Sequence, residues 1–413
     1  MLTEIERQIA AGSDGAAMAM RIVADAARLM GAPRLIPIES AHIDGALYHG
    51  DSGTLFAERL VERGARVAVR ATLNVGALDL TGGCRVRLNE PDRHMARRMM
   101  DAYRALGCEP TWTCAPYQAG HRPTRGTDVA WGESNAVVFC NSVLGARTNR
   151  YGDFLDIACA IAGRAPYYGL HRPENRVATL LFDVSALPAS FLSSEIAWPV
   201  LGSLFGRETG TAIGVVKGIS THPGEDALKA FGAASASSGA VGLFHVAGIT
   251  PEAPDLAAAL GCVEPAVTIR VTPRMIADAK ARMSTVEMPD RIDAVAIGSP
   301  HLSSEELDRL ENLVAGRLLA VPLYACTGRH VLARLSRERR AALKRTGVVL
   351  VADTCVVVTP ILPELKGGVL MTNSGKFAHY APGNTGYSVL YGSLVECVES
   401  AVKGKPSLTD MTT

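Results

Sequence analysis

The chain has 413 residues, 48% of them hydrophobic and only 5% aromatic, and its 42 basic and 41 acidic residues leave a net charge of +1. This length exceeds what one core usually holds, so we expect two or three subdomains. The charge is scattered, which excludes the clustered basic surface of a nucleic-acid-binding protein. No run approaches the ~18 apolar residues of a membrane span, and the first residues lack the pattern of a secretory signal. We therefore expect a cytoplasmic protein with neither nucleic acid nor membrane as a partner.

The first two thirds of the chain read as helices and strands in alternation. A helix is predicted over residues 3–30, a strand over 34–40, a glycine-rich link over 49–53, a helix over 55–64 and a strand over 65–75. The middle, residues 169–285, mixes strands such as 177–184 with a run of small residues over 231–249. Such a run is typical of close helix–sheet packing, and a loop near a ligand is the alternative.

The clearest unit lies over residues 290–360. Strands are predicted over 291–299, 318–325 and 348–354, with helices over 300–316 and 329–347 between them. Ser303 and Glu306 have the spacing of a capping box. Strands that alternate with helices of this length predict a right-handed parallel unit. The predicted fold class is therefore α/β, with parallel sheets covered by helices on both faces, and residues 401–413 are expected to form a tail.

Several cysteines stand where chemistry is expected. Ligands bind at the carboxyl ends of parallel strands, and the strands of the 290–360 unit end at Ser299, Cys326 and Cys355. Cys114 lies in a loop that proline and glycine keep irregular, and a strand predicted over 136–139 leads Cys140 into a polar segment. Cys114, Cys140 and Cys355 could hold an iron–sulfur cluster with one iron open to substrate. Buried structural thiols are the alternative.

Polar side chains gather after apolar runs in four segments, residues 49–53, 71–76, 140–150 and 371–384. They are Asp51, Asn74, Asn141, Ser142, Arg147, Arg150, Asn373, Ser374 and Lys376. Amides and hydroxyls in such places suit a pocket for a small polar acid, whose carboxylate an arginine would pair. Taken singly, each residue can also be a turn former, a cap or a surface charge.

Seven segments resemble, in order, the large subunit or catalytic region of aconitase X enzymes: "RLIPIESAHIDG", "TLNVGALDL", "TCAPY", "WGESNAVVFCNSVLGARTNR", "VAIGSPHLSSEEL", "VADTCVVVTPIL" and "MTNSGKFAHYAPG". The resemblance extends from about Arg34 to Cys397, so the catalytic region would cover residues 1–400. The resemblance implies an aconitase-like fold and dehydration of a small hydroxy acid at an iron–sulfur cluster. The family includes cis-3-hydroxy-L-proline dehydratases, which form pyrroline-2-carboxylate, and mevalonate 5-phosphate dehydratases.

The resemblance also implies which residues bind the cluster. Cys114 and Cys355 match ligand positions of the family. In the mevalonate branch a third cysteine stands at the position of Ser299, and serine is a poor substitute for a soft thiolate. Cys140 is predicted to take its place, with Cys326 as the alternative. This exchange favours the hydroxyproline branch and a two-iron cluster, with three or four irons left open.

The substrate contacts that the resemblance implies lie in the polar segments. They are Gly50, Asp51, Ser52, Asn74, Val75, Asn141, Ser142 and Ser374, to which the residue types add Arg147. Backbone N–H groups of the Gly50 turn would orient the substrate, and the side chains would bind its carboxylate and hydroxyl group.

A dehydratase also needs a base for the proton on the carbon next to the carboxylate. Aconitase-like enzymes carry it as a serine on a swivelling domain, and this sequence has no such loop. The resemblance therefore implies a partner, either a small swivel subunit or a fused swivel domain. His42, His245 and Lys376 are in-chain candidates for proton transfer. Two alternatives stay open: mevalonate 5-phosphate as the substrate, and a non-enzymatic sensor that binds a metal or ligand.

Overall fold

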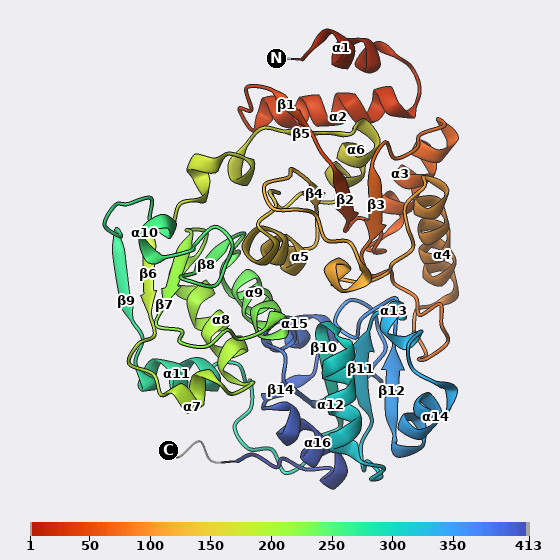
Figure 1. Ribbon diagram of the computed structural model, residues 1–413. Coiled ribbons are helices and arrows are strands. Elements are labelled where there is room, and N and C mark those ends of the chain that lie inside the picture. Colours follow the sequence, from red (N-terminus) through yellow and green to blue (C-terminus); the bar gives the residue numbers. More distant parts are fainter. Residues whose placement is uncertain (1, 410–413) are drawn as a thin grey trace.

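The structure is a computed structural model that describes residues 2–409. Four sheets form within this range, and three of them are parallel throughout, with three, four and five strands (Figure 1). The predicted α/β class with parallel sheets is confirmed. Within residues 2–409, no helix combines the length and the apolar character needed to cross a membrane.

The first region carries the three-stranded sheet, in the order β3-β2-β4. Its elements are α1 (Glu4–Ala11), α2 (Gly15–Leu29), β1 (Leu35–Pro37), β2 (Ser40–Ile43), α3 (Asp51–Glu62), β3 (Arg70–Leu73), α4 (Glu90–Ala105), β4 (Ala130–Trp131), α5 (Ser134–Phe139), α6 (Leu155–Ala162) and β5 (Arg164–Pro166). The helix predicted over 3–30 is two helices, because Asp14 accepts a hydrogen bond from the Ala17 N–H and caps a new start. The strand predicted over 34–40 is also divided: β1 pairs with β5, and β2 enters the parallel sheet.

The segment after β4 is helical, so the strand predicted over 136–139 is wrong. The Glu133 side chain accepts a hydrogen bond from the Asn135 N–H and caps α5. A π-helical turn over Cys140–Leu144 follows, and Gly145 ends it in the left-handed conformation. Every residue of α5 is buried. A short helix that is buried on all sides resembles a strand in sequence, because no polar face marks its period.

The second region is built on the four-stranded sheet β8-β7-β6-β9. Its elements are β6 (Leu180–Asp183), α7 (Ala189–Leu192), α8 (Ala197–Thr209), β7 (Gly214–Lys217), α9 (Glu225–Gly239), β8 (Phe244–Val246), α10 (Leu256–Ala259), β9 (Val267–Arg270) and α11 (Pro273–Ala281). The run of small residues over 231–249 forms α9 and β8. Close packing is present as predicted, but between two helices: a Cβ built on Gly206 of α8 would lie 2.5 Å from the Ser235 carbonyl oxygen of α9.

The third region holds the five-stranded sheet β12-β11-β10-β13-β14. Its elements are β10 (Ala294–Leu302), α12 (Ser304–Val314), β11 (Leu323–Thr327), α13 (Arg329–Leu332), α14 (Arg337–Thr346), β12 (Val348–Val351), β13 (Val369–Thr372), α15 (Gly375–Thr385), β14 (Ser388–Tyr391) and α16 (Leu394–Lys403). The capping box of Ser303 and Glu306 forms as predicted. The helix predicted over 329–347 is divided into α13 and α14, because Ser336 caps a second start.

The five-stranded sheet is buried on both faces, as is usual for parallel strands. Along β10, Ala294 and Ala296 pack into one core with Phe377 of α15. Val295 and Ile297 point the other way and pack into a second core with α12 and α16. This alternation follows from the period of two along a strand, and it confirms that helices cover both faces of this sheet.

Three helices, one from each region, meet at the centre of the molecule (Figure 1). A Cβ built on Gly232 of α9 would lie 3.0 Å from Val138 of α5. One built on Gly375 of α15 would lie 2.9 Å from Ala234 of α9. Small residues thus let α5, α9 and α15 approach each other, and this contact brings the three parallel sheets together.

The tail predicted over 401–413 begins inside α16. The Ser407 N–H donates to the Ser400 hydroxyl, and the Thr409 N–H donates to the Glu396 carboxylate. The chain therefore folds back on α16 as far as Thr409. The remaining part of the predicted tail, residues 410–413, lies outside the described residues.

Candidate functional site

The carboxyl ends of the first sheet bring three polar side chains together. Asp44 follows β2, Asn74 follows β3, and Glu133 follows β4 after one glycine. The Asn74 side-chain amide donates to Asp44 Oδ1 and, over 3.0 Å, to Glu133 Oε2. Because this edge of a parallel sheet is where ligands bind, the three side chains mark a candidate site.

Lys376 reaches the same place from the third sheet. It lies in the first turn of α15, just after β13. Its Nζ donates to Glu133 Oε1 over 2.5 Å and to Asn135 Oδ1 over 2.8 Å. The carboxyl edges of two sheets therefore meet across one largely buried ion pair. We call Asp44, Asn74, Glu133, Asn135 and Lys376 the polar network.

The two carboxyl groups of the polar network have pKa values shifted in opposite directions. Burial alone would raise the pKa of Glu133, but the charge and hydrogen bond of Lys376 lower it to about 2. For Asp44, burial and then the charges of Glu133 and Asp156 raise the pKa to about 8. At neutral pH, Glu133 is therefore ionised and Asp44 is mostly protonated. Such a pair gives one site a fixed negative charge and a proton donor.

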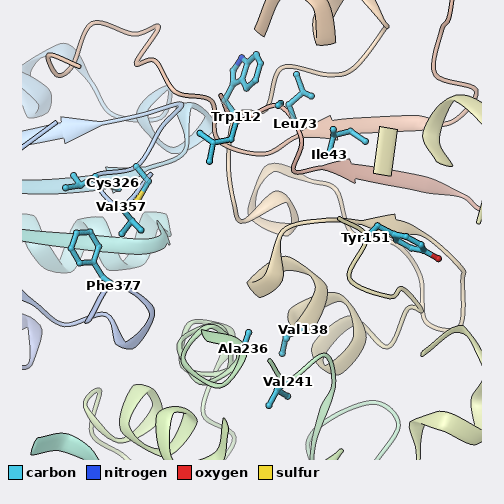
Figure 2. Packing of buried hydrophobic residues seen from close by; sticks show 14 of the residues in the cluster. Ile43, Leu73, Trp112, Val138, Tyr151, Ala236, Val241, Cys326, Val357 and Phe377 are labelled. Carbon is cyan, nitrogen blue, oxygen red and sulfur yellow. The ribbon is translucent and has the colours of Figure 1, made fainter. Parts of the chain in front are cut away.

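Two thiols lie in contact at the carboxyl edge of the third sheet. The Cys326 thiol donates a hydrogen bond to Cys355 Sγ, and so does the Ser299 hydroxyl. The bond between the thiols raises the pKa of Cys326 and lowers that of Cys355. Figure 2 shows Cys326 in the same buried cluster as Val357 and Phe377. A thiolate at Cys355 is therefore favoured over one at Cys326.

Cys114 approaches this pair from the first region. Its Sγ accepts a hydrogen bond from the His301 N–H over 3.3 Å, and its carbonyl accepts one from the Asn135 amide over 2.8 Å. Burial raises the pKa of Cys114 to about 12; the charge of Lys376 opposes the shift and that of Cys355 adds to it. Lys376 thus acts on Cys114 and Cys355 alike. We call Cys114, Cys326 and Cys355 the thiol group.

The structure does not bring Cys140 to the thiol group. Its side chain is fully buried in a small apolar cluster with Tyr117 and Phe139, whose rings stack 3.6 Å apart. Burial raises the pKa of Cys140, opposed by the charge of Arg176, and no other thiol of residues 2–409 contributes to that shift. Its role as a ligand stays a prediction.

The donor atoms of the thiol group are of the kind that an iron–sulfur cluster requires. Within residues 2–409, no three His, Cys, Asp or Glu side chains converge closely enough to hold one ion. A cluster presents separate irons to its thiolates, so its ligands need not converge on one point. Three soft, buried sulfur donors beside the cation of Lys376, which offsets thiolate charge, therefore suit such a group.

Three of the predicted substrate positions form one turn. Gly50, Asp51 and Ser52 lie at the start of α3, where Gly50 adopts a φ of +127°. The Asp51 side chain accepts a hydrogen bond from the Tyr48 hydroxyl over 2.9 Å. This turn belongs to the connection from β2 to α3 that also carries Asp44. Val75 is buried, next to Asn74 in the chain.

Asn141 and Ser142 connect the first and second regions. The Asn141 amide donates to the Gly242 carbonyl over 2.9 Å and accepts from Arg176 over 3.0 Å. The Ser142 hydroxyl accepts from the Phe244 N–H over 2.9 Å. The Asn141 amide would have to exchange protein partners to contact substrate, whereas the Ser142 hydroxyl keeps a hydrogen that it can donate. Their substrate role stays a prediction.

The two other predicted substrate residues lie apart in the chain. Ser374 caps α15, where its hydroxyl accepts from the Phe377 N–H and donates to the Ser299 carbonyl oxygen. It therefore stands beside Lys376. Arg147 belongs to the first region, and its buried Nε has no hydrogen-bond partner among residues 2–409.

The three candidates for proton transfer differ in charge state. His42 is fully buried, and burial lowers its pKa to about 3. Burial also lowers the pKa of His245, whose Nε2 lies 2.8 Å from the Arg176 carbonyl oxygen. The pKa of Lys376 is raised, because Glu133 outweighs the effect of burial. The imidazoles are therefore neutral and weakly basic, and the ammonium group cannot accept a proton while it is charged.

A cavity of about 550 Å³ adjoins Lys376 from the side of the second region. Ser299 and Ser374 line it from the third region. The second region contributes the segment 192–196 between α7 and α8 and the segment 219–223 that follows β7. This volume suits a small organic ligand. The cavity therefore gives the carboxyl edges of the second and third sheets a shared space.

Sequence reasoning missed three members of the polar network, Asp44, Glu133 and Asn135. Asp44 and Glu133 share one signal, a carboxylate placed directly after a short strand. That signal is visible for Asp44 in "HIDG", but β4 has only two residues, so the end that precedes Glu133 is not marked in the sequence. Asn135 belongs to α5, whereas the apolar run that follows it, residues 136–139, predicts a strand and leaves Asn135 outside any element.

Comparison with known proteins covers nearly the whole chain. Models of the first, second and third domains of Aconitase X match residues 1–174, 178–281 and 292–403. A Pseudomonas aeruginosa protein named cis-3-hydroxy-L-proline dehydratase is 43% identical, over 98% of this chain and 70% of its own length. A phosphomevalonate dehydratase large subunit from Methanothermobacter thermautotrophicus is 38% identical, over 90% of this chain and 91% of its own length.

A solved structure gives the same result for the fold. The crystal structure of Thermococcus kodakaraensis aconitase X, described as the holo-form, matches with a TM-score of 0.86. It is 33% identical in sequence, and the match covers 97% of this chain and 100% of that one. The order of elements and the meeting of the sheets described above are thus those of a known enzyme fold.

Proposed function

The chain belongs to the aconitase X family, and on that premise we propose that it dehydrates cis-3-hydroxy-L-proline to pyrroline-2-carboxylate at an iron–sulfur cluster. Its relatives are hydro-lyases, so the chain is an enzyme of that class and the sensor hypothesis is set aside. Two relatives named for this substrate are 43% and 39% identical. The serine at position 299 also favours the hydroxyproline branch of the family.

One observation carries the proposal: the buried Glu133–Lys376 ion pair stands beside the thiol group. When bound, a cluster with an open iron supplies a Lewis acid for the departing hydroxyl group. Lys376 offsets the charge of the thiolates, and Glu133 holds Lys376 in place. The turn at Gly50 and the hydroxyl of Ser374 would orient the substrate carboxylate.

For the ligands we favour Cys114, Cys355 and Cys326. The hydrogen bond between Cys326 and Cys355 supports the third member, which the sequence ranked behind Cys140. Ser299 shares that contact through its hydroxyl, and this is the position that carries a cysteine in the mevalonate branch. A hydroxyl is a poor iron ligand, which fits a two-iron cluster.

The ligand set is tested by loading the chain with iron and sulfide without oxygen. Cys114→Ser, Cys326→Ser and Cys355→Ser should each lose most of the bound iron and the thiolate-to-iron absorption. Cys140→Ser is the matched control and should keep both. The reverse result, iron lost in Cys140→Ser and kept in Cys326→Ser, would return the third ligand to Cys140.

The base is proposed to come from a swivel subunit or a fused swivel domain. Several relatives are named as large subunits and align over nearly their full length, which supports a second polypeptide. The Pseudomonas relative is longer than the chain, and 70% of its length is covered. Within this chain, the low pKa of His42 and the ion pair of Lys376 make both poor bases.

The substrate is tested by direct comparison. The loaded chain, combined with a swivel subunit, is assayed for pyrroline-2-carboxylate from cis-3-hydroxy-L-proline, and its binding of mevalonate 5-phosphate is measured by calorimetry. Turnover of the first compound with weak binding of the second is expected. Tight binding of mevalonate 5-phosphate with no turnover of hydroxyproline would move the chain to the other branch.

A further inference from the structure

Asp44 occupies a special place in the polar network. It follows the middle strand of the first sheet, β2, so the carboxyl ends of β3 and β4 flank it on either side. Its backbone is fixed, because the N–H groups of Asp44 and Gly45 both donate to Asp156 Oδ2, over 2.6 and 3.1 Å. Asn74 fixes one side-chain oxygen, Oδ1.

The other oxygen of Asp44 is available. Oδ2 accepts no hydrogen bond from the described residues, and the side chain is only partly buried. The groups that act on Asp44 are negative: Glu133 at the start of α5, and Asp153 and Asp156 at the start of α6. Tyr103 of α4 packs behind, with its hydroxyl against Gly45. Lys376, the cation of the polar network, is paired with Glu133.

This environment favours the protonated acid. Burial and the three carboxylates raise the pKa of Asp44 to about 8. The Asn74 amide also bonds Glu133, whose pKa is instead lowered because of the charge of Lys376. A carboxylic acid that keeps its proton at neutral pH and presents a free oxygen is a general acid in the correct form.

We propose that Asp44 is the acid that protonates the leaving hydroxyl group of the substrate. The inference rests on the proposed dehydratase function and adds a residue to it. As the C–O bond breaks, its electron pair goes to the hydroxyl oxygen, which takes the proton of Asp44 and departs as water. The electrons of the broken C–H bond form the double bond, and its proton goes to the base of the swivel part. Asp44 regains a proton from solvent, so the protons balance.

The first test is the pH dependence of turnover by the holoenzyme with its swivel part. Wild-type kcat should fall as the pH rises through about 8, because the ionised acid cannot donate. Asp44→Asn should lower kcat by about 100-fold or more and abolish this alkaline limb, and Asp44→Glu should restore part of it. Asp153 is exposed, and its charge helps to raise the pKa of Asp44. Asp153→Asn should therefore keep kcat at pH 6 and move the alkaline fall in kcat to lower pH.

A second readout does not need turnover. Infrared difference spectra between pH 6 and pH 9.5 should contain a protonated-carboxyl band that Asp44→Asn removes. The pKa of Asp156 is raised to about 7, so this residue contributes a separate signal that should remain in the variant. If the wild-type enzyme turns over neither hydroxy acid, the proposed function is wrong. This outcome is established with the wild-type enzyme alone, before any variant is measured. If wild type is active but Asp44→Asn keeps a third of kcat, the alkaline limb and the band, the role of Asp44 is overturned and the dehydratase stands.

Discussion

At the scale of single residues, the Glu133–Lys376 pair controls the charge of the site. Replacing Lys376 by Met leaves Glu133 buried without a cation, so we expect a loss of about 3 kcal/mol in the free energy of unfolding. The double variant Glu133→Gln/Lys376→Met should recover much of this loss, because it removes both charges. Urea unfolding of the four proteins gives the coupling energy. Additive losses would show that the two side chains do not interact in solution.

The two carboxyl groups of the polar network, Glu133 and Asp44, make the stability of the protein depend on pH in opposite ways. Glu133 has a lowered pKa in the fold, about 2 against an ordinary 4.5, so its contribution is present above pH 4.5 and is lost as the pH falls toward 2. Asp44 has a raised pKa, about 8 against 3.8, so the fold loses stability as the pH rises from 4 through 8. Asp44→Asn should therefore raise the melting temperature at pH 9 more than at pH 5. An equal change at both values would contradict the raised pKa.

At the scale of elements, the contact of α8 with α9 depends on glycine. Gly206→Ala places a methyl group 2.5 Å from the Ser235 carbonyl oxygen, and we expect a loss of about 1–3 kcal/mol because the helices must move apart. Gly383→Ala is the matched control: it also lies in a helix, but it is exposed and has nothing within 4 Å. It should stabilise by up to about 1 kcal/mol through helix propensity. Equal effects in urea unfolding would show that the contact is loose.

Elements with a clear period or a clear cap could be predicted from the sequence. The α12 helix with its capping box and the parallel strands around it are examples. Failures arose where burial erased the period, as in α5, or where one serine restarted a helix, as Ser336 does for α14. The strand β4 is too short to be recognised at all.

Only part of the candidate site could be predicted, because some of its residues are marked by local sequence and others depend on the pairing of distant strands. Cys114, Cys355 and Lys376 were identified from loops and strand ends, and the structure brings them near each other. Asp44 and Glu133 were missed, because their pairing depends on which strands lie side by side. The strand order β3-β2-β4 joins distant parts of the chain, and no local sequence pattern predicts it.

At the scale of the whole molecule, the carboxyl edges of the three parallel sheets face the site, and the base is proposed to come from a swivel part. We therefore expect the purified chain to bind iron but to show no turnover with either hydroxy acid. Addition of a swivel subunit should bring activity that saturates with its concentration, measured as product formed per iron-loaded chain. Full turnover by the chain alone would contradict this expectation and move the base into this polypeptide.

The ion pair at the centre also has a consequence for how the protein reaches its native state. Glu133 and Lys376 are 243 positions apart in the chain, and closing a loop of that length costs on the order of 5 kcal/mol in entropy. Contacts of such long range form late in folding. Cys114 and Cys355 are separated by a similar interval, so a nascent chain can offer both thiols to the proposed cluster only after synthesis has passed residue 355. On the proposed ligand set, iron uptake would therefore report that the first and third regions have come together.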